Sequence, residues 1–190
     1  ELISAVESLK RQGADVFAAP FDVCEIDRHS EMLSSIEENL GPLTTLVNNA
    51  GVGVIHRSDP LEVTPESFER CMSVNARAVF FLSQAFSKLL VGRDRESEIF
   101  HSIINITSSN AVAVAVPRSE YCASKAAASM ISKTFAVNGN RRDSPGNEHR
   151  QNRGIWTSSV CVKNRIRGRG HRPCQQPLIR PCRRHFHGRY

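Results

Sequence analysis

The sequence has no long apolar run and no leader-like opening. None of its hydrophobic stretches reaches the roughly 20 residues that a membrane-spanning helix needs. No charged segment followed by an apolar one stands at its start. We therefore expect a soluble, cytoplasmic protein without a membrane partner. A length of 190 residues predicts one domain with a sizeable core.

A regular cysteine framework is also missing. The six cysteines, at positions 24, 71, 122, 161, 174 and 182, follow no repeated spacing, which is typical of a reducing compartment and predicts no disulfide. The last three lie near His185 and His187, but no pair has the C-x-x-C spacing common in zinc sites. We therefore expect no metal site.

Acidic residues are scarce in the last part of the chain. Residues 138–190 carry 13 Lys and Arg against 2 Asp and Glu, whereas residues 1–137 carry 12 basic and 17 acidic side chains. The net charge of +6 thus averages two unlike regions. This break predicts a folded domain over residues 1–137 and a basic, disordered or out-of-frame tail over residues 138–190, with no helical or strand period.

The residues that point to chemistry lie between Ser108 and Lys125. Two residues four apart lie on one face of a helix, so Lys125 would sit beside the phenol of Tyr121. A nearby ammonium ion lowers the pKa of a phenol from about 10 toward neutrality, where the group can exchange protons. Ser108 follows the apolar run 103–106, so we expect it at the carboxyl end of a strand, where ligands bind in open α/β sheets. Taken alone the Tyr-Lys spacing is weak, because a solvated helix face produces it as well.

Two further polar features accompany this segment. An apolar strand leads into Asn49, Ala50 and Gly51, where small residues would let the backbone approach a cofactor, although an ordinary Asn-Gly turn looks the same. Asn75 lies in an apolar helical pattern, where an amide is usually a structural residue bonded to backbone. Together and in this order, these motifs resemble the short-chain dehydrogenase/reductase family over about residues 1–137.

The resemblance implies a fold and an activity. The fold would be a Rossmann-like, doubly wound parallel α/β sheet in three layers, and the reaction would interconvert a ketone and a secondary alcohol with NAD or NADP. Tyr121 would exchange a proton with the substrate oxygen, and Ser108 would hold that oxygen. Lys125 would bind the nicotinamide ribose, and Asn75 would anchor a water that links the lysine to solvent.

The same resemblance assigns further residues to the cofactor. Asn49, Ala50 and Gly51 would lie at the nicotinamide-side ribose, and Asp22 with Val23 at the adenine. For Asp22, a strand-end carboxylate that caps the next turn is an equally open interpretation. The 3-oxoacyl-acyl-carrier-protein reductases look nearest, which implies a ketone, alcohol or acyl thioester as substrate. Family members commonly form dimers or tetramers, which we expect here by analogy.

Apolar periodicities and turn residues predict the elements. We expect helices over residues 1–12, 32–40 and 65–90 and from about residue 121, and strands over residues 16–21, 43–47 and 102–106. Thr64 and Pro65 have the residue types of an N-cap and a first helical position, which marks the start of the third helix. The strand at 16–21 should be buried.

Two features of the family are absent from the sequence. There is no glycine-rich turn to hold the cofactor pyrophosphate at a helix N-terminus. In the order 3-2-1-4-5-6, the strands at 16–21 and 43–47 would be third and fourth, and the two strands between them are missing. Backbone groups beside this gap would be unpaired. A catalytically inactive fragment is therefore the alternative to an active enzyme.

Three interpretations of residues 138–190 are open. An out-of-frame or mispredicted segment accounts for the abrupt change in composition, and we favour it. An arginine-rich tail that binds nucleic acid would use segments such as residues 165–169, but the tail has few aromatic residues and no recognisable module. A zinc site is opposed by the spacing of its cysteines and histidines.

Overall fold

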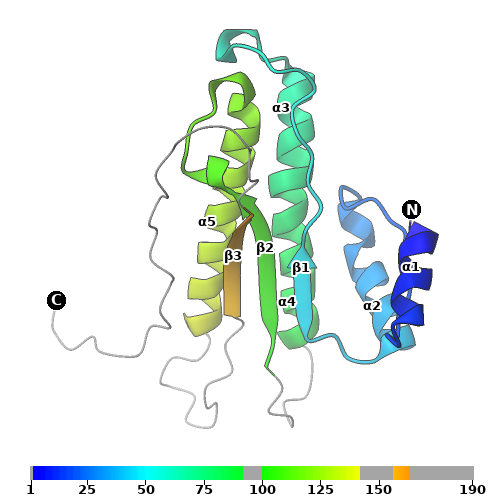
Figure 1. Cartoon of the computed structure of the whole chain (residues 1–190). Coiled ribbons are helices and arrows are strands. Elements are labelled where there is room, and N and C mark those ends of the chain that lie inside the picture. Colours follow the sequence, from blue (N-terminus) through cyan, green and yellow to red (C-terminus); the bar gives the residue numbers. More distant parts are fainter. Residues whose placement is uncertain (1, 92–99, 142–155, 163–190) are drawn as a thin grey trace, which may run out of the picture.

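The computed structural model describes residues 2–91, 100–141 and 156–162 (Figure 1). Its helices and strands are α1 (Leu2–Arg11), α2 (His29–Leu40), β1 (Thr45–Asn48), α3 (Pro65–Met72), α4 (Val79–Val91), β2 (Ser102–Ser108), α5 (Ser119–Arg141) and β3 (Trp156–Val162). A π-helical segment, η3 (Ser73–Ala78), joins α3 to α4. Short 3-10 turns stand in the connections: η1 (Ile26–Arg28), η2 (Pro60–Glu62), η4 (Ser109–Ala111) and η5 (Val116–Arg118).

The described strands form one parallel sheet in the order β1-β2-β3. Asn48 at the end of β1 pairs with Asn105 of β2, and Ser108 at the end of β2 pairs with Val162 of β3. Parallel neighbours need a crossover connection. The continuous helical stretch from α3 to α4 lies in the crossover from β1 to β2, and α5 lies in the crossover from β2 to β3. The predicted parallel α/β sheet is therefore confirmed, and the carboxyl ends of β1 and β2 meet at one edge.

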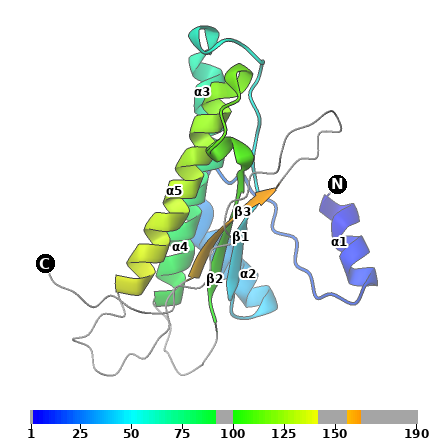
Figure 2. The ribbon, with the colours of Figure 1, turned by 60° about the vertical axis from the view of Figure 1, so that its left-hand side comes forward.

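The helices that cover the sheet lie together. Helices α4 and α5 run side by side (Figures 1 and 2), and α2 packs against α4. Helix α1 lies on the other side of the strands in Figure 2 and has no buried residue. The buried core comes from α2, α4 and β2: Leu33, Leu82, Phe86, Leu90 and Ile103. Each side chain of this size contributes about 1.5–3 kcal/mol when fully buried.

The predicted start of the third helix is confirmed. The hydroxyl of Thr64 accepts a hydrogen bond from the Ser67 backbone N–H at 3.3 Å, and Pro65 is the first helical residue. Helical structure then continues through η3 to the end of α4. Among the described residues, no helix is both long and apolar enough to cross a membrane.

The buried strand predicted at residues 16–21 does not form. This segment is only partly buried and makes no strand pairing within the described chain. A cavity of about 280 Å³, lined by Ala19, Phe21, Leu46, Val47 and other residues, separates it from β1. A β-strand forms only through ladder hydrogen bonds to a neighbouring strand. Because the cavity keeps residues 16–21 from β1, this segment stays an extended connection.

The expectation that residues 138–190 contain no strand is wrong for residues 156–162. These residues form β3, which pairs with β2 in parallel along its whole length. Helix α5 also continues to Arg141, beyond the predicted break at residue 137. The segment of β3 includes aromatic and β-branched residues, which favour strands once a partner strand is in place. The arginine-rich segment at 165–169 and the histidines near the end lie outside the described residues.

Candidate active site

Ser108 stands where the sequence predicted, at the carboxyl end of β2. It is half-buried, and its hydroxyl oxygen accepts a hydrogen bond from the Asn110 backbone N–H at 3.2 Å, which caps η4. This cap holds the chain as it turns away from the sheet. The hydroxyl proton stays available to a ligand, because the hydroxyl acts only as an acceptor in this contact.

Lys125 and Tyr121 lie close together on the first turns of α5, as their spacing predicted. The Lys125 Nζ is 6.0 Å from the centroid of the Tyr121 ring and donates a 2.9 Å hydrogen bond to the Ile106 carbonyl. Lys125 is only 6% exposed, and this burial lowers the pKa of its ammonium group. Within the described chain, the hydroxyls of Ser108 and Tyr121 are not hydrogen-bonded to each other.

Asn75 is a fully buried amide in the π-helical segment η3. Its Oδ1 accepts a hydrogen bond from the Val52 N–H at 2.8 Å, and its Nδ2 donates to the Val52 carbonyl at 2.9 Å and to the Ser124 hydroxyl at 3.0 Å. The amide thus joins the loop after β1 to α5. This is the structural role that an amide in an apolar helix suggests, and the predicted water relay to Lys125 stays a prediction.

Gly51 lies between Asn75 and Lys125. A Cβ atom added at Gly51 would be 3.3 Å from the Asn75 Oδ1 and 3.3 Å from the Lys125 Nζ. Both distances are tighter than ordinary van der Waals contact. The predicted need for a small residue at this position therefore has a local cause, namely the close approach of two polar side chains that belong to the site.

We expect Gly51→Ala to destabilise the protein by about 1–2 kcal/mol, because the new methyl group must displace the Asn75 amide or the Lys125 ammonium. Urea denaturation measures this change as a shift in the unfolding midpoint. Gly53→Ala is the matched control, because a Cβ there meets no atom within 4 Å. Equal stability of the two variants would show that the site tolerates the methyl group.

A buried polar network that the sequence analysis missed fastens the sheet to the helices. The Asn48 Nδ2 donates to the Asn105 Oδ1 at 2.7 Å and to the Ser83 hydroxyl at 3.0 Å. The Asn105 Nδ2 in turn donates to the Ser132 hydroxyl at 2.7 Å. The network links α4, β1, β2 and α5 and fixes the strands below the site. Its only sequence signal is an asparagine near the end of two successive apolar strands.

A second unpredicted contact anchors the start of α5 beside Tyr121. Glu120 is 3% exposed, and its Oε1 accepts a 2.6 Å hydrogen bond from the Ser67 hydroxyl of α3. The Ser67 oxygen also accepts a hydrogen bond from the Ile55 N–H at 3.2 Å. The Ser67 hydroxyl therefore links three segments, namely helix α3, the loop after β1 and the active-site end of α5. Nothing in the spacing of these residues indicates that they meet.

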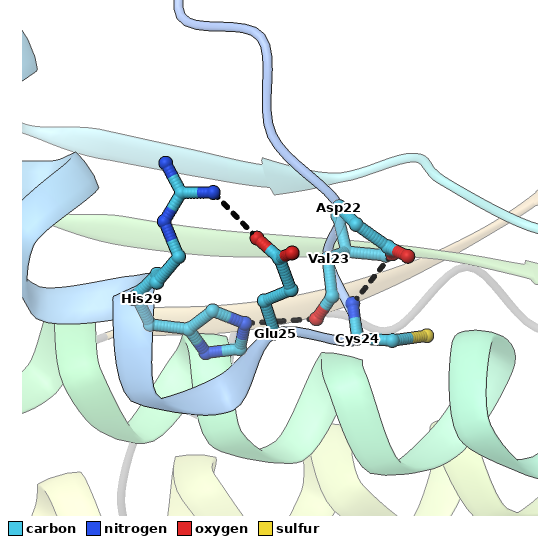
Figure 3. A network of polar contacts seen from close by, with 6 residues as sticks. Asp22, Val23, Cys24, Glu25 and His29 are labelled. Carbon is cyan, nitrogen blue, oxygen red and sulfur yellow. Dashed lines mark hydrogen bonds and ion pairs between the residues drawn. The ribbon is translucent and has the colours of Figure 1, made fainter.

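The predicted cofactor residues divide into two groups. Asn49 and Ala50 line the 280 Å³ cavity beside β1, and Val23 lines it from the opposite segment. Asp22 is exposed, and its Oδ1 accepts a hydrogen bond from the Cys24 N–H at 2.8 Å. This contact (Figure 3) is the one that the turn-capping interpretation of Asp22 describes, and the role at the adenine stays a prediction.

Comparison with known proteins identifies the family of the chain. The profile of the short chain dehydrogenase family matches residues 1–143. The chain belongs to this family. The chain is 34% identical over 134 residues to the 5-keto-D-gluconate 5-reductase of Escherichia coli strain K12. That alignment covers 70% of this chain and 50% of the relative, so the chain spans about half the length of the curated relatives it matches.

Two solved short-chain dehydrogenases show the same fold. A 3-oxoacyl-[acyl-carrier protein] reductase from Brucella melitensis in complex with NAD superposes with a TM-score of 0.69 at 29% identity, covering 74% of this chain and 55% of that one. A gluconate 5-dehydrogenase from Burkholderia cenocepacia in complex with NADP and tartrate has a TM-score of 0.64 at 26% identity, covering 73% and 51%. The predicted Rossmann-like fold is confirmed by these matches.

Proposed function

We propose that this chain carries the proton-transfer site of an NAD(P)-dependent oxidoreductase that interconverts a ketone and a secondary alcohol. The observation that carries the proposal is the buried ammonium of Lys125 beside the Tyr121 ring. Burial of an ammonium group costs stability unless its donors are used. A lysine with a single hydrogen bond at such a position is therefore more useful for binding than for folding.

The residues present fit a nicotinamide dinucleotide. Lys125 has three donors, of which the described structure uses one, on the Ile106 carbonyl, so two are available for ribose hydroxyls. The exposed turn from Asn49 to Gly51 lies next to this ammonium, and Val23 faces Asn49 across the cavity. The cofactor would give hydride to the carbonyl carbon or take it from the alcohol carbon. The two related structures contain NAD and NADP respectively, so both forms of the cofactor are candidates.

Tyr121 and Ser108 would handle the substrate oxygen. During reduction the Tyr121 phenol donates its proton to that oxygen, and the Ser108 hydroxyl donates a hydrogen bond that polarises the carbonyl. Lys125 offsets the negative charge that the phenol leaves behind. Asn75, through Val52 and Ser124, keeps the loop after β1 and helix α5 in register, and we retain for it the proposed water relay to Lys125.

We propose a 3-oxoacyl thioester as the first substrate class, in line with the Brucella reductase. The Escherichia coli and Burkholderia relatives act on gluconate derivatives, so a keto sugar acid is the second class to be assayed.

Homo-oligomer formation also remains a proposal. Phe68 of α3 and Met130 of α5 are 41% and 59% exposed, which provides apolar surface for a second copy.

The experiment is a titration of NADH and NADPH with the purified 190-residue chain, followed by cofactor fluorescence. We expect saturable binding of at least one cofactor, and weaker binding by about tenfold when Lys125 is changed to Met, because two hydrogen bonds to the ribose are lost. Buffer and a folded reductase serve as negative and positive controls. Absence of saturable binding for both cofactors would overturn the proposal and leave an inactive fragment.

A further inference from the structure

Glu120 is a buried carboxylate directly before Tyr121, at the second position of α5. It is 3% exposed, and its side-chain partners are two hydroxyls, Ser67 at 2.6 Å from Oε1 and Ser119 at 3.5 Å from Oε2. It forms no ion pair within the described part of the chain. A carboxylate buried without a cation has a cost in stability, which the positive end of a helix dipole offsets only in part. The short bond from Ser67 is therefore the interaction that holds this charge in place.

The Ser67 hydroxyl is itself buried and acts as both donor and acceptor. Its single proton goes to Glu120, and its oxygen accepts a hydrogen bond from the Ile55 N–H at 3.2 Å. Ser67 is 5% exposed, so water does not compete for either contact. Because a hydroxyl has one proton to donate, this one points at the carboxylate. The contact thus has a defined direction as well as a short length.

A second contact of the same kind lies one turn further along α5. There the Asn75 amide binds both the loop after β1 and the Ser124 hydroxyl. Glu120 and Ser124 are four residues apart, so they lie on one face of α5. The residues that follow them, Tyr121 and Lys125, lie about 100° further around the helix. The attachment of the first face therefore sets where the second face points.

The contacts hold different turns of the helix. The second turn is also fixed by the hydrogen bond from Lys125 to the Ile106 carbonyl. In the first turn, the Glu120–Ser67 bond is the described side-chain hydrogen bond that reaches another helix, namely α3, which packs beside α5 (Figure 2). A helix attached at one turn can still pivot and fray at its end, whereas two attachments one turn apart fix its rotation. The turn that depends on Glu120 is the one that carries Tyr121.

We infer that Glu120 is a positioning residue whose carboxylate, docked on Ser67, fixes the first turn of α5 and so directs the Tyr121 phenol toward the substrate oxygen. The direction toward a substrate rests on the proposed function, whereas the fixing of the turn does not. Glu120 takes no part in the reaction itself, because it is buried and both of its oxygens are bonded to hydroxyls.

Three substitutions separate the contact from the charge. Glu120→Ala removes the acceptor, whereas Glu120→Gln removes the charge and keeps a carbonyl oxygen for the Ser67 hydroxyl. Ser67→Ala removes the same contact from the other side. Glu66→Ala is the matched control, because Glu66 is also the second residue of its helix but is exposed. Its amide exchange rates and kcat should stay within about twofold of those of the unsubstituted chain.

Amide hydrogen exchange tests whether the turn is fixed. The amides of Ala123 and Ser124 report on it, because in an α-helix they bond to carbonyls four residues earlier. In Glu120→Ala we expect these two amides to exchange about tenfold faster, while the amides of residues 126–132 and of β2 keep their rates. Glu120→Gln should return exchange to within about threefold of the unsubstituted chain. Unchanged exchange in Glu120→Ala, or equal acceleration along all of α5 and β2, would overturn the fixing of the turn.

Turnover of a ketone substrate tests the catalytic part. In Glu120→Ala we expect kcat to fall about tenfold while KM and cofactor affinity stay within about twofold, because a misdirected phenol weakens only the transition state. Glu120→Gln should restore kcat to within about threefold. Ser67→Ala should lower kcat about as much as Glu120→Ala, and the double variant should lower it no further, since both substitutions remove one contact.

The outcomes separate the positioning role from the proposed function. If the unsubstituted chain reduces the ketone and Glu120→Ala keeps its kcat, or if Glu120→Gln fails to restore kcat, the role in directing Tyr121 is overturned. If exchange is as expected and the unsubstituted chain turns over no ketone, the proposed function fails while the fixing of the turn by Glu120 stands.

Discussion

Replacing Tyr121 by Phe is expected to lower the turnover of a ketone substrate by about 10²–10⁴-fold, the usual contribution of a positioned proton donor. The substitution removes one oxygen and keeps the ring that packs near the Lys125 ammonium. Cofactor affinity should therefore stay within about twofold, because Lys125 still reaches the ribose. The measurement combines steady-state reduction of a ketone with a separate cofactor titration.

Cys122→Ala is the matched control for this prediction. Cys122 is the next residue on α5, and its thiol makes only a long, 3.8 Å contact with the Ala115 carbonyl. We expect its removal to leave turnover within about threefold of the unsubstituted protein. Turnover that survives in Tyr121→Phe would show that another group supplies the proton, and the assignment of Tyr121 would be wrong.

Lys125→Met is expected to abolish measurable turnover while the fold becomes no less stable at pH 7. The buried ammonium loses hydration and keeps one hydrogen bond, so replacing it with an apolar chain of similar length removes a desolvation cost. The substitution also leaves the Ile106 carbonyl without its hydrogen bond, which offsets part of this effect. We therefore expect the free energy of unfolding to rise by between zero and about 1 kcal/mol. Chemical denaturation and a turnover assay of the same preparation measure both effects.

The pH dependence of this gain follows from the lowered pKa of Lys125. In the folded chain the lysine loses its proton at a lower pH than the unfolded value of 10.5. Between the two values the unfolded state binds more protons, so the stability of the unsubstituted protein rises with pH in this window. The advantage of Lys125→Met should therefore be largest below the folded pKa and shrink as the pH rises toward 10.5.

Lys133→Met provides the control for the lysine. Lys133 lies on the same helix but is exposed, so its charge stays hydrated in the folded state. Turnover should stay within about twofold of the unsubstituted protein. A large loss of stability in Lys125→Met would mean that the ammonium group holds α5 to β2 and that its role in binding is secondary.

The residues closest to the proposed chemistry could be predicted because their contacts are local. Tyr121 and Lys125 are four residues apart on one helix, and helical geometry alone brings them together. Ser108 was placed correctly because it ends an apolar run that forms β2. The N-cap at Thr64 is equally local, since a side chain and a backbone N–H three residues later decide it.

The wrong predictions concern strands whose formation depends on pairing with a strand far away in the sequence. Residues 16–21 have a strand-like composition, but a cavity separates them from β1, so no ladder forms. Residues 156–162 looked irregular within a basic tail, but an available edge of β2 makes them a strand. The local composition of a segment does not reveal whether a partner strand lies beside it. The presence of that partner strand decides whether the segment forms a strand.

The family, the parallel α/β class and the spacing of Ser108, Tyr121 and Lys125 along their elements could all be predicted from the sequence. The tertiary structure alone decided how buried Lys125 is, how Asn75 and Gly51 share space beside it, and that Glu120 reaches the Ser67 hydroxyl. The physical reason is the separation along the chain over which each kind of interaction acts. Helix and strand periods act over a few residues, whereas burial and side-chain hydrogen bonds join segments that are far apart along the chain and meet only after folding.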